Sequence, residues 1–264
     1  MDQELTKLRA SLACADREIL EALKKRFACV KKMIQYKKNR GLPIFDEDQE
    51  QEKLNGIEAM LQNYPHKAEI LKIFSEIMTA SKAIQSQKAF DKNIMLIGFM
   101  GTGKSTVTKN LGQRLAAKTI EMDDYIVEKE GMSIPEIFEQ RGETYFRNCE
   151  SNLLIVLAQE NHLIVSCGGG VPLRDENRAL LKNSGTVVWL TATPEAVYNR
   201  VKSGRNRPIL NGNMNVPFIR ELMEKRLEKY EAAADIQIDT TDKAVDDICA
   251  ELLKKVYDFN YIKF

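Results

Sequence analysis

The eight residues from Gly98 to Ser105 are the part of this chain best suited to chemistry, and they read Gly-Phe-Met-Gly-Thr-Gly-Lys-Ser. They fit the pattern G-x-x-x-x-G-K-[ST], in which the backbone N–H groups of glycines wrap phosphate oxygens. Lys104 is then placed between β- and γ-phosphates, and Ser105 offers a hydroxyl to Mg²⁺. The pattern predicts a bound nucleotide but leaves open whether the acceptor is water, a nucleotide or a metabolite. The candidate nucleotide-binding residues here are Gly98, Gly101, Thr102, Gly103, Lys104, Ser105 and Thr106.

Acidic residues follow a predicted strand at 119–122, where the chain continues with Glu121, Asp123 and Asp124. Ligands of open α/β sheets bind beyond the carboxyl ends of the strands. We therefore expect these carboxylates to face the nucleotide.

Two further stretches offer groups for an acceptor. Arg147 and Glu150 lie one helical turn apart, and a guanidinium group binds a carboxylate through two parallel hydrogen bonds. Gly168, Gly169 and Gly170 directly follow a buried strand and allow close approach of the backbone to a ligand. A tight turn alone needs one glycine, so three favour a binding site.

These motifs resemble those of the shikimate kinases over about residues 93–256. The resemblance implies that Asp123 holds the reacting hydroxyls of shikimate and helps to deprotonate one of them. It implies that Arg147 and Arg226 bind the shikimate carboxylate, and that Glu150 orients these arginines. The triple glycine would line the acceptor site through its backbone.

The same resemblance assigns the remaining parts of a phosphoryl-transfer site. Arg207, in a glycine- and asparagine-rich stretch with the composition of a lid, would close over the phosphates of ATP, although an ordinary surface loop has a similar composition. Arg200 would lie against the adenine, near residues 239–243. Lys104, Asp123 and Arg207 are the expected catalytic residues.

One position departs from the family pattern, and it concerns the metal. Where the family usually has D-x-D, this chain has Glu121-Met122-Asp123. Ser105 and Glu121 are the expected Mg²⁺-organising residues. Because glutamate is one methylene longer than aspartate, we expect an altered metal dependence rather than loss of activity.

Two alternatives remain for this module. A P-loop ATPase or switch would leave Arg147, Arg226 and the triple glycine unexplained. A kinase for another small acceptor, such as gluconate or a nucleoside monophosphate, is a nearer rival. The paired arginines favour an acidic, polyhydroxylated ring.

The elements that position these groups begin with strand-like runs separated by helical patterns, which predict a parallel sheet covered by helices. We expect an α/β P-loop kinase fold at 91–264, with a five-stranded parallel sheet like that of the nucleoside monophosphate kinases. An all-α, three-helix domain is expected at 1–90. The predicted strands span 94–99, 119–122, 163–167, 186–190 and 236–239.

The first ninety residues are dominated by one predicted helix over 4–38, followed by helices at about 46–62 and 66–88. Leu5, Leu8 and Leu12 begin an apolar stripe that continues at helical spacing. Such a helix is about 50 Å long at 1.5 Å per residue, too long to bury its stripe against the shorter helices. This predicts a homodimer formed through the helical module.

Polar residues interrupt or flank this stripe at spacings that resemble the all-helical chorismate mutases over about residues 4–88. The resemblance implies a cofactor-free rearrangement of chorismate to prephenate. Arg26 and Arg9 of the partner subunit would bind the two substrate carboxylates, while Lys37 and Gln85 would donate to the ether oxygen as its bond breaks. The full set of expected chorismate-site residues is Arg9, Arg26, Lys37, Asp46, Gln49, Glu50, Ser81 and Gln85.

This module also departs from its family at one position. Gln49 stands where the family commonly has arginine before the equivalent of Glu50, so one cation for the anionic substrate is missing. Asp46 and Glu50 would accept hydrogen bonds from the substrate hydroxyl or nearby backbone. The alternative is a dimerisation or regulatory bundle, in which the basic side chains are simply solvated.

The composition of the chain argues against several other classes of protein, namely nucleic-acid-binding, zinc-binding and membrane-spanning proteins. The formal net charge is +1, which gives no global signal for nucleic acid or a membrane. Five scattered cysteines without a C-x-x-C pattern predict reduced thiols in a cytoplasmic protein and no zinc site. No apolar run is long enough to span a bilayer.

Overall fold

The computed structural model describes residues 3–40, 47–202 and 215–261. The chain divides into two compact units, Met1–Ala89 and Phe90–Phe264, which are described separately below. The sequence places the two functional domains at 1–90 and 91–264, and this division stays a prediction.

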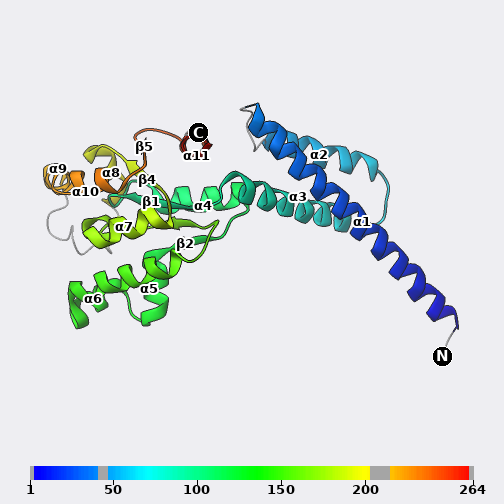
Figure 1. Cartoon of the computed structure of the whole chain (residues 1–264), viewed down its shortest axis with the longest axis horizontal. Coiled ribbons are helices and arrows are strands. Elements are labelled where there is room, and N and C mark those ends of the chain that lie inside the picture. The colour runs from blue at the N-terminus through cyan, green and yellow to red at the C-terminus, as the bar shows by residue number, and fades with distance from the viewer. Residues whose placement is uncertain (1–2, 41–46, 203–214, 262–264) are drawn as a thin grey trace. The chain divides into compact units, whose positions relative to one another are not determined.

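The N-terminal unit consists of helices only. Helix α1 (Gln3–Asn39) packs on α3 (Lys67–Ala89), and α2 (Glu47–Met60) packs on α3 as well (Figure 1). The three helices predicted from the sequence are confirmed, with ends that shift by one or two residues. The buried apolar residues of the unit lie on α1 and α3 and include Val30, Ile34 and Met78.

The N-terminal half of α1 keeps its apolar stripe exposed. The relative exposure of these side chains is 44% for Leu5, 63% for Leu8, 65% for Leu12, 57% for Ile19 and 52% for Leu20. The stripe therefore lacks a packing partner among the described residues of this unit, as expected from the length of the helix.

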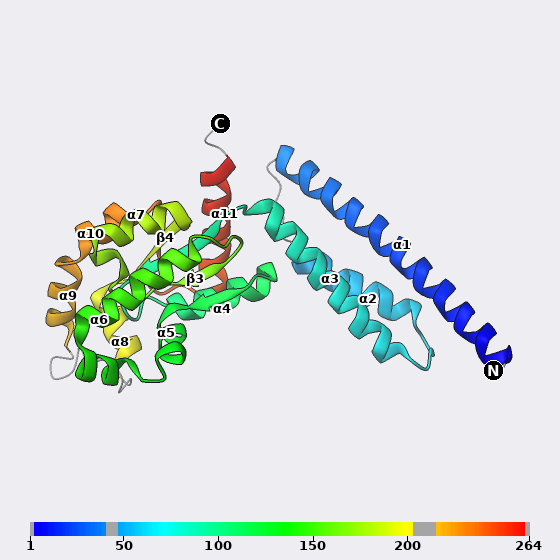
Figure 2. The same cartoon turned by 60° about the horizontal axis from the view of Figure 1, so that its bottom comes forward.

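The C-terminal unit is built on one parallel sheet of five strands in the order β2-β3-β1-β4-β5. The central strand β1 pairs with β3 on one side and with β4 on the other, and its six residues are all buried. Figure 2 labels these two neighbouring strands, β3 and β4. This confirms the predicted five-stranded parallel sheet. The strands are β1 (Asn93–Gly98), β2 (Thr119–Glu121), β3 (Ile164–Ser166), β4 (Gly185–Thr191) and β5 (Ile236–Asp239).

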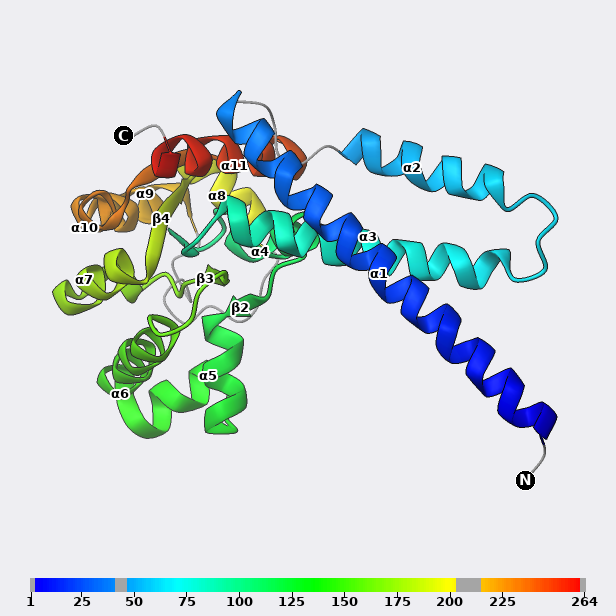
Figure 3. The same ribbon diagram turned by 45° about the vertical axis from the view of Figure 1, so that its right-hand side comes forward.

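Helices cover both faces of the sheet. Helices α4 and α11 pack against each other and against the strands, and α7 and α10 pack on β4. Helices α5 and α6 pack together near β2 (Figure 3). The bounds are α4 (Lys104–Leu115), α5 (Met122–Glu130), α6 (Ile134–Leu157), η1 (Val171–Leu173), α7 (Asp175–Ser184), α8 (Pro194–Val201), α9 (Val216–Glu224), α10 (Leu227–Ala233) and α11 (Val245–Tyr261).

The start of β1 is held by side chains of its own unit. Asn93 is fully buried, and its Nδ2 donates to the carbonyl oxygens of Leu157 and Glu160 over 3.1 and 2.9 Å. Its Oδ1 accepts from the backbone N–H of Leu163 over 3.0 Å. Nδ1 of His162 lies 2.7 Å from the carbonyl oxygen of Phe90.

Candidate active site

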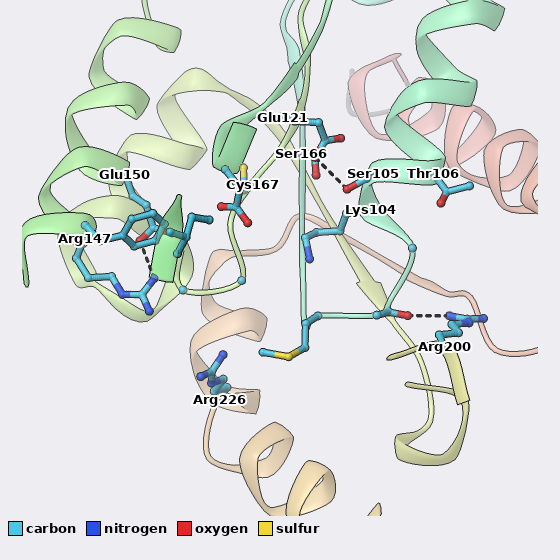
Figure 4. A pocket seen from close by; sticks show the side chains of 18 of the residues that line it. Lys104, Ser105, Thr106, Glu121, Arg147, Glu150, Ser166, Cys167, Arg200 and Arg226 are labelled. Carbon is cyan, nitrogen blue, oxygen red and sulfur yellow. Dashed lines mark hydrogen bonds and ion pairs between the residues drawn. The ribbon is translucent and has the colours of Figure 1, made fainter. Parts of the chain in front are cut away.

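A cavity of about 820 Å³ opens beside the carboxyl ends of β1, β2 and β3. Figure 4 shows Arg147 and Arg226 on one side of this cavity and Arg200 on the other, with Lys104 between them. The cavity therefore joins the predicted nucleotide residues to the predicted acceptor residues. Among the predicted residues it is lined by Gly101, Gly103, Lys104, Ser105, Thr106, Glu121, Asp123, Arg147, Glu150, Gly169, Gly170, Arg200 and Arg226.

The phosphate loop connects β1 to α4 and depends on its glycines. Gly101 and Gly103 have φ values of +79° and +93°, a region that side chains rarely adopt. At Gly98 a Cβ atom would lie 2.4 Å from the carbonyl oxygen of Leu190. Thr102 is fully buried, and its hydroxyl donates to the carbonyl oxygen of Phe99 over 2.8 Å. This hydrogen bond stabilises the conformation of the loop.

Lys104 begins α4, and its ammonium group lies across the loop. Nζ donates to the carbonyl oxygens of Gly98 over 2.9 Å and Phe99 over 3.2 Å. The helix N-terminus directs its first N–H groups toward the same place, which favours an anion there. This positive site is where the sequence predicts the phosphates.

Ser105 and Glu121 meet across the cavity from the first turn of α4 and the end of β2. The Ser105 hydroxyl donates to Oε2 of Glu121 over 3.0 Å. Burial raises the pKa of Glu121, and hydrogen bonds from Ser166 and Ser105 oppose that shift. A hydroxyl and a carboxylate are oxygen ligands of the kind Mg²⁺ prefers, so this donor pair fits the metal.

No cluster of three or more His, Cys, Asp or Glu suited to a metal occurs among the described residues. A magnesium ion at Ser105 and Glu121 would therefore take most of its ligands from nucleotide phosphates and water, which is usual for this ion.

The acceptor side is organised by an ion-pair network on α6. Nη1 of Arg147 lies 2.8 Å from Oε2 of the fully buried Glu150, and Nη2 lies 2.8 Å from Oε1 of Glu143. Burial raises the pKa of Glu150 to about 7, although Arg147 lowers it, and the nearby charge of Asp123 raises it. Its second oxygen, Oε1, is buried without a partner.

The triple glycine is required at two of its three positions. At Gly168 a Cβ would lie 2.5 Å from Oε1 of Glu150 and 2.8 Å from Oδ1 of Asp123. At Gly170 a Cβ would lie 2.0 Å from Nη1 of Arg147. At Gly169 no atom comes closer than 3.6 Å. The first and third glycines therefore make room for the chain's own acceptor-site side chains, a role that the sequence alone does not separate from room for a ligand.

Arg226, at the start of α10, is the second predicted clamp residue. Its guanidinium lies 5.5 Å from the centre of the Phe99 ring, a favourable cation–π geometry. One turn later Tyr230, which is 2% exposed, donates from its hydroxyl to the carbonyl oxygen of Gly169 over 2.6 Å. Burial raises the Tyr230 pKa to about 12, while the charge of Arg226 and a hydrogen bond from it act in the opposite direction.

Arg200 joins the phosphate loop to the loop after β5. Nη1 donates to the carbonyl oxygen of Gly101 over 3.3 Å and to the hydroxyl of Thr240 over 3.0 Å, and Nη2 donates to the Thr240 carbonyl over 2.6 Å. The Thr240 hydroxyl in turn donates to the Thr102 carbonyl over 3.1 Å. Arg200 therefore lies beside residues 239–243, as predicted, whereas its contact with adenine stays a prediction.

In the N-terminal unit the structure brings together Arg26 on α1 and Ser81 on α3. The Arg26 guanidinium donates to the Ser81 hydroxyl, and the Ile77 carbonyl lies 3.4 Å away. Burial lowers the pKa of Arg26. Arg9 is exposed on the same helix, about 25 Å along the axis from Arg26, so it does not reach this site within one chain.

For the other predicted chorismate-site residues the structure gives only the burial of the side chain or no description. Lys37 and Gln85 are half-buried on α1 and α3, and Gln49 is exposed on α2. Asp46 and Arg207 lie outside the described residues, and so does the side chain of Glu50. Their roles remain predictions.

Three residues of the kinase site were missed or left without a role by the sequence reasoning. Ser166 bonds Glu121 from the end of β3, Thr240 bonds Arg200, and Tyr230 bonds the triple glycine. The position of Ser166 at a strand end was a usable signal for the first. Tyr230 lies four residues after the predicted Arg226, but nothing in that spacing pointed to Gly169.

Comparison with known proteins decides between the candidate families. Residues 100–257 match the family model described as shikimate kinase. The chain belongs to the shikimate kinase family. A shikimate kinase of Geobacter metallireducens is 43% identical over 161 residues, which is 61% of this chain and 89% of that protein. One from Sulfurihydrogenibium sp. is 41% identical over 62% of this chain and 98% of that protein.

Solved shikimate kinases share the fold. The enzyme from Acinetobacter baumannii in complex with shikimate matches with a TM-score of 0.62 and 34% identity, over 65% of this chain and 96% of that one. The enzyme from Aquifex aeolicus matches with a TM-score of 0.56 and 34% identity, over 63% and 96%. These shikimate kinases correspond to about two thirds of the chain, and shikimate kinases use ATP as their phosphoryl donor.

The N-terminal unit has a family match of its own. Residues 8–86 match the model described as chorismate mutase type II, which confirms the second resemblance. The chain therefore joins a chorismate mutase type II domain to a shikimate kinase domain. None of the described helices is long and apolar enough to cross a membrane.

Proposed function

We propose that the protein phosphorylates shikimate to shikimate 3-phosphate with ATP and that its N-terminal domain, 1–90, converts chorismate to prephenate, both in aromatic amino acid biosynthesis. The kinase domain is 91–264. The observation that carries the kinase proposal is the single cavity that contains the phosphate loop, Asp123 and the two arginines Arg147 and Arg226. A site that only binds a nucleotide would leave Asp123, Arg147 and Arg226 in that cavity without a role.

In the proposed reaction, Arg147 and Arg226 bind the substrate carboxylate and fix the ring in the acceptor half of the cavity. Asp123 accepts the proton of the attacking hydroxyl. The hydroxyl oxygen forms a bond to the γ-phosphorus of ATP as the bond between that phosphorus and the β–γ bridging oxygen breaks, and ADP leaves. Lys104 neutralises the charge that develops on the phosphate oxygens, and this stabilisation with in-line positioning supplies most of the catalysis.

Ser105 and Glu121 would hold Mg²⁺, which neutralises phosphate charge when bound. The longer side chain of Glu121 would change the distance at which its carboxylate meets that ion. Arg207 is retained as the proposed catalytic arginine of a closing segment, and Arg200 as the proposed adenine contact.

A coupled assay of ADP release with shikimate, gluconate and AMP as acceptors tests the kinase proposal. We expect the highest kcat/KM with shikimate, because two guanidinium groups and Asp123 match an acidic, polyhydroxylated ring. Fastest turnover with either of the other acceptors would contradict it.

A chorismate mutase site has to bind a substrate with two carboxylates, and it needs cationic side chains and amide hydrogen-bond donors around that substrate. Arg26 and Ser81 are already linked, and Lys37 and Gln85 are half-buried on the same two helices. Preorganised donors at the ether oxygen stabilise the charge that grows there, and binding holds the flexible substrate in its reactive shape. Gln49, in place of a cation, would weaken substrate binding and leave the ether-oxygen donors in place.

We further propose that the N-terminal domain forms a homodimer in which the exposed stripe of α1 is covered by the partner. Five apolar side chains on that stripe are 44–65% exposed. Dimerisation would also bring Arg9 of the partner subunit within reach of the Arg26 site. A cytoplasmic location is retained as a prediction.

Loss of chorismate absorbance in the presence of the full chain, at a concentration where a dimer is confirmed by sedimentation, tests the mutase proposal. We expect first-order decay well above the uncatalysed rate. Decay no faster than in buffer would favour a dimerisation or regulatory domain instead.

A further inference from the structure

A second cavity, of about 210 Å³, lies behind the phosphate loop among β4, α9 and α10. It is smaller than the roughly 300–1,000 Å³ of sites that hold drug-sized ligands. Apolar cavities of about 150 Å³ hold a single benzene ring, so this one has room for one ring and a short chain. Its lining comprises Phe99, Thr102, Trp189, Leu190, Thr191, Pro194, Arg220, Met223, Glu224, Leu227 and Tyr230.

The lining of this cavity is mostly apolar, and Phe99, Trp189 and Tyr230 are its aromatic residues. Trp189 and Tyr230 stack with their ring centres 5.9 Å apart and their planes inclined by 3°. The hydroxyl of Thr102 is engaged with a backbone carbonyl over 2.8 Å, and that of Thr191 lies 3.4 Å from another, so neither needs a ligand as a partner. The interior therefore suits an aromatic ring.

The polar groups of the lining carry both signs. Arg220 and Glu224 lie one turn apart on α9, and both are exposed. Arg220 pairs through Nη2 with Glu195 over 2.7 Å. Glu224 has no ion-pair partner recorded within the described part of the chain. A ligand with an ammonium and a carboxylate group on the same carbon atom would match this pair of opposite charges.

Two walls of this cavity are shared with the acceptor site. Phe99 lines the cavity, and the centre of its ring lies 5.5 Å from the Arg226 guanidinium. Tyr230 lines the cavity as well, and its hydroxyl donates to the Gly169 carbonyl oxygen over 2.6 Å. A molecule that displaces either ring therefore acts directly on a shikimate-binding group.

We propose that this cavity is an effector site for an aromatic α-amino acid, whose ring enters beside Trp189 and whose zwitterionic group meets Arg220 and Glu224. Occupancy weakens acceptor binding through Tyr230 and Phe99. The effect on the acceptor rests on the proposed shikimate kinase activity, whereas the binding itself does not.

The protein contains one tryptophan, and it lines this cavity at 7% exposure, so its fluorescence reports occupancy without any enzyme assay. The probe is L-phenylalanine added to the full chain, with emission excited at a wavelength that only tryptophan absorbs. We expect a saturable change below about 10 mM, which fills even a site with a Kd near 1 mM. No saturable change would overturn the proposal.

Three analogues test the chemistry of the site. Phenethylamine lacks the carboxylate, 3-phenylpropionate lacks the ammonium, and leucine lacks the aromatic ring. Each is expected to bind at least about tenfold more weakly, as expected when a charged contact or an aromatic contact is lost. Equal binding by any of them would refute the corresponding part of the assignment.

The matched variants are Glu224→Gln, which should weaken L-phenylalanine about tenfold, and Glu221→Gln on the same helix, which does not line the cavity and should leave binding unchanged. Loss of binding in both would point to a damaged helix and overturn the role of Glu224. Filling the cavity by Leu227→Phe should abolish the fluorescence change.

The coupling between this cavity and the acceptor site is measured separately, through the effect of each ligand on the other. L-phenylalanine at saturation should raise the KM for shikimate about fivefold, and shikimate should weaken L-phenylalanine by the same factor, because linkage is reciprocal. Binding without this mutual effect would refute the coupling through Tyr230 and leave a simple ligand site. A failure of kinase activity with intact binding would refute the proposed function alone.

Discussion

Substitution of Gly170 by alanine is expected to disable the shikimate site while sparing the fold. The residue has φ −93° and ψ −13°, which alanine adopts without strain. The added Cβ would lie 2.0 Å from Nη1 and 2.4 Å from Cζ of Arg147, so the guanidinium must move. The guanidinium is the flexible end of a side chain that lines the cavity of about 820 Å³, so it can move into that cavity.

The size of the effect follows from what Arg147 contributes. Hydrogen bonds to charged groups are worth about 1.5–3 kcal/mol. Losing this contact to the substrate carboxylate should raise the KM for shikimate about 10- to 100-fold, with little change in the KM for ATP. Steady-state kinetics with each substrate varied in turn measure both.

The stability of the variant should depend on pH. A displaced Arg147 leaves Glu150 buried without its cation, and an uncompensated buried charge costs about 3–5 kcal/mol. The pKa of Glu150 is already raised to about 7, so at pH 6 the carboxyl is largely protonated and this penalty is mostly avoided. Urea unfolding of Gly170→Ala should therefore match the parent within about 1 kcal/mol at pH 6 and fall below it at pH 8.

A double-mutant cycle tests the cause. If Gly170→Ala acts by moving Arg147, adding it to Arg147→Ala should cost nothing further in kcat/KM. Additive losses, an unchanged shikimate KM, or a loss of several kcal/mol at pH 6 would each refute the reasoning.

Four other predictions concern the metal, pH, the mutase and the dimer. Glu121→Asp should shift the Mg²⁺ and Mn²⁺ dependence of kinase turnover, and unchanged metal preference and turnover would contradict the role given to this residue. Because burial raises the pKa of Glu150 from 4.5 to about 7, the free energy of unfolding should fall by about 3 kcal/mol as pH rises through that window, and Glu150→Gln should remove this slope in urea titrations across pH. Arg26→Ala should abolish loss of chorismate absorbance and leave ADP release with shikimate near the parent rate, so a parallel loss of both would show that the domains are not independent. Leu8→Asp, at a position 63% exposed in the single chain, should shift the sedimentation equilibrium toward monomer, whereas an unchanged dimer would place the interface elsewhere.

Much of the kinase fold was predictable because its signals are local. Each strand is a short apolar run, and the phosphate loop specifies its own strand–loop–helix context. The apolar residues at helical spacing likewise predicted the long helix α1 and the exposure of part of its stripe, whereas the homodimer that would cover the stripe stays a prediction. Element ends moved by only a residue or two.

Contacts between distant side chains were not predictable in the same way. Gly168 and Gly170 are forced by Glu150, Asp123 and Arg147, which lie far from them in sequence. The bond from Tyr230 to Gly169 joins residues 61 positions apart. Such pairings depend on the packing of α6 and α10 on the sheet, and a single sequence without its fold carries no period or spacing that specifies them.

The side chain of Asn93 has a consequence for how a second enzyme can be attached to this one. Its three hydrogen bonds, with that of His162 to Phe90, fasten the first strand to the turn after α6 using only residues that follow position 89. Fraying that begins in α3 has to break these buried and partly buried hydrogen bonds before it reaches the sheet. These hydrogen bonds therefore stop local unfolding of the helical domain from spreading along the chain into the sheet. The helical domain can unfold while the kinase domain stays folded.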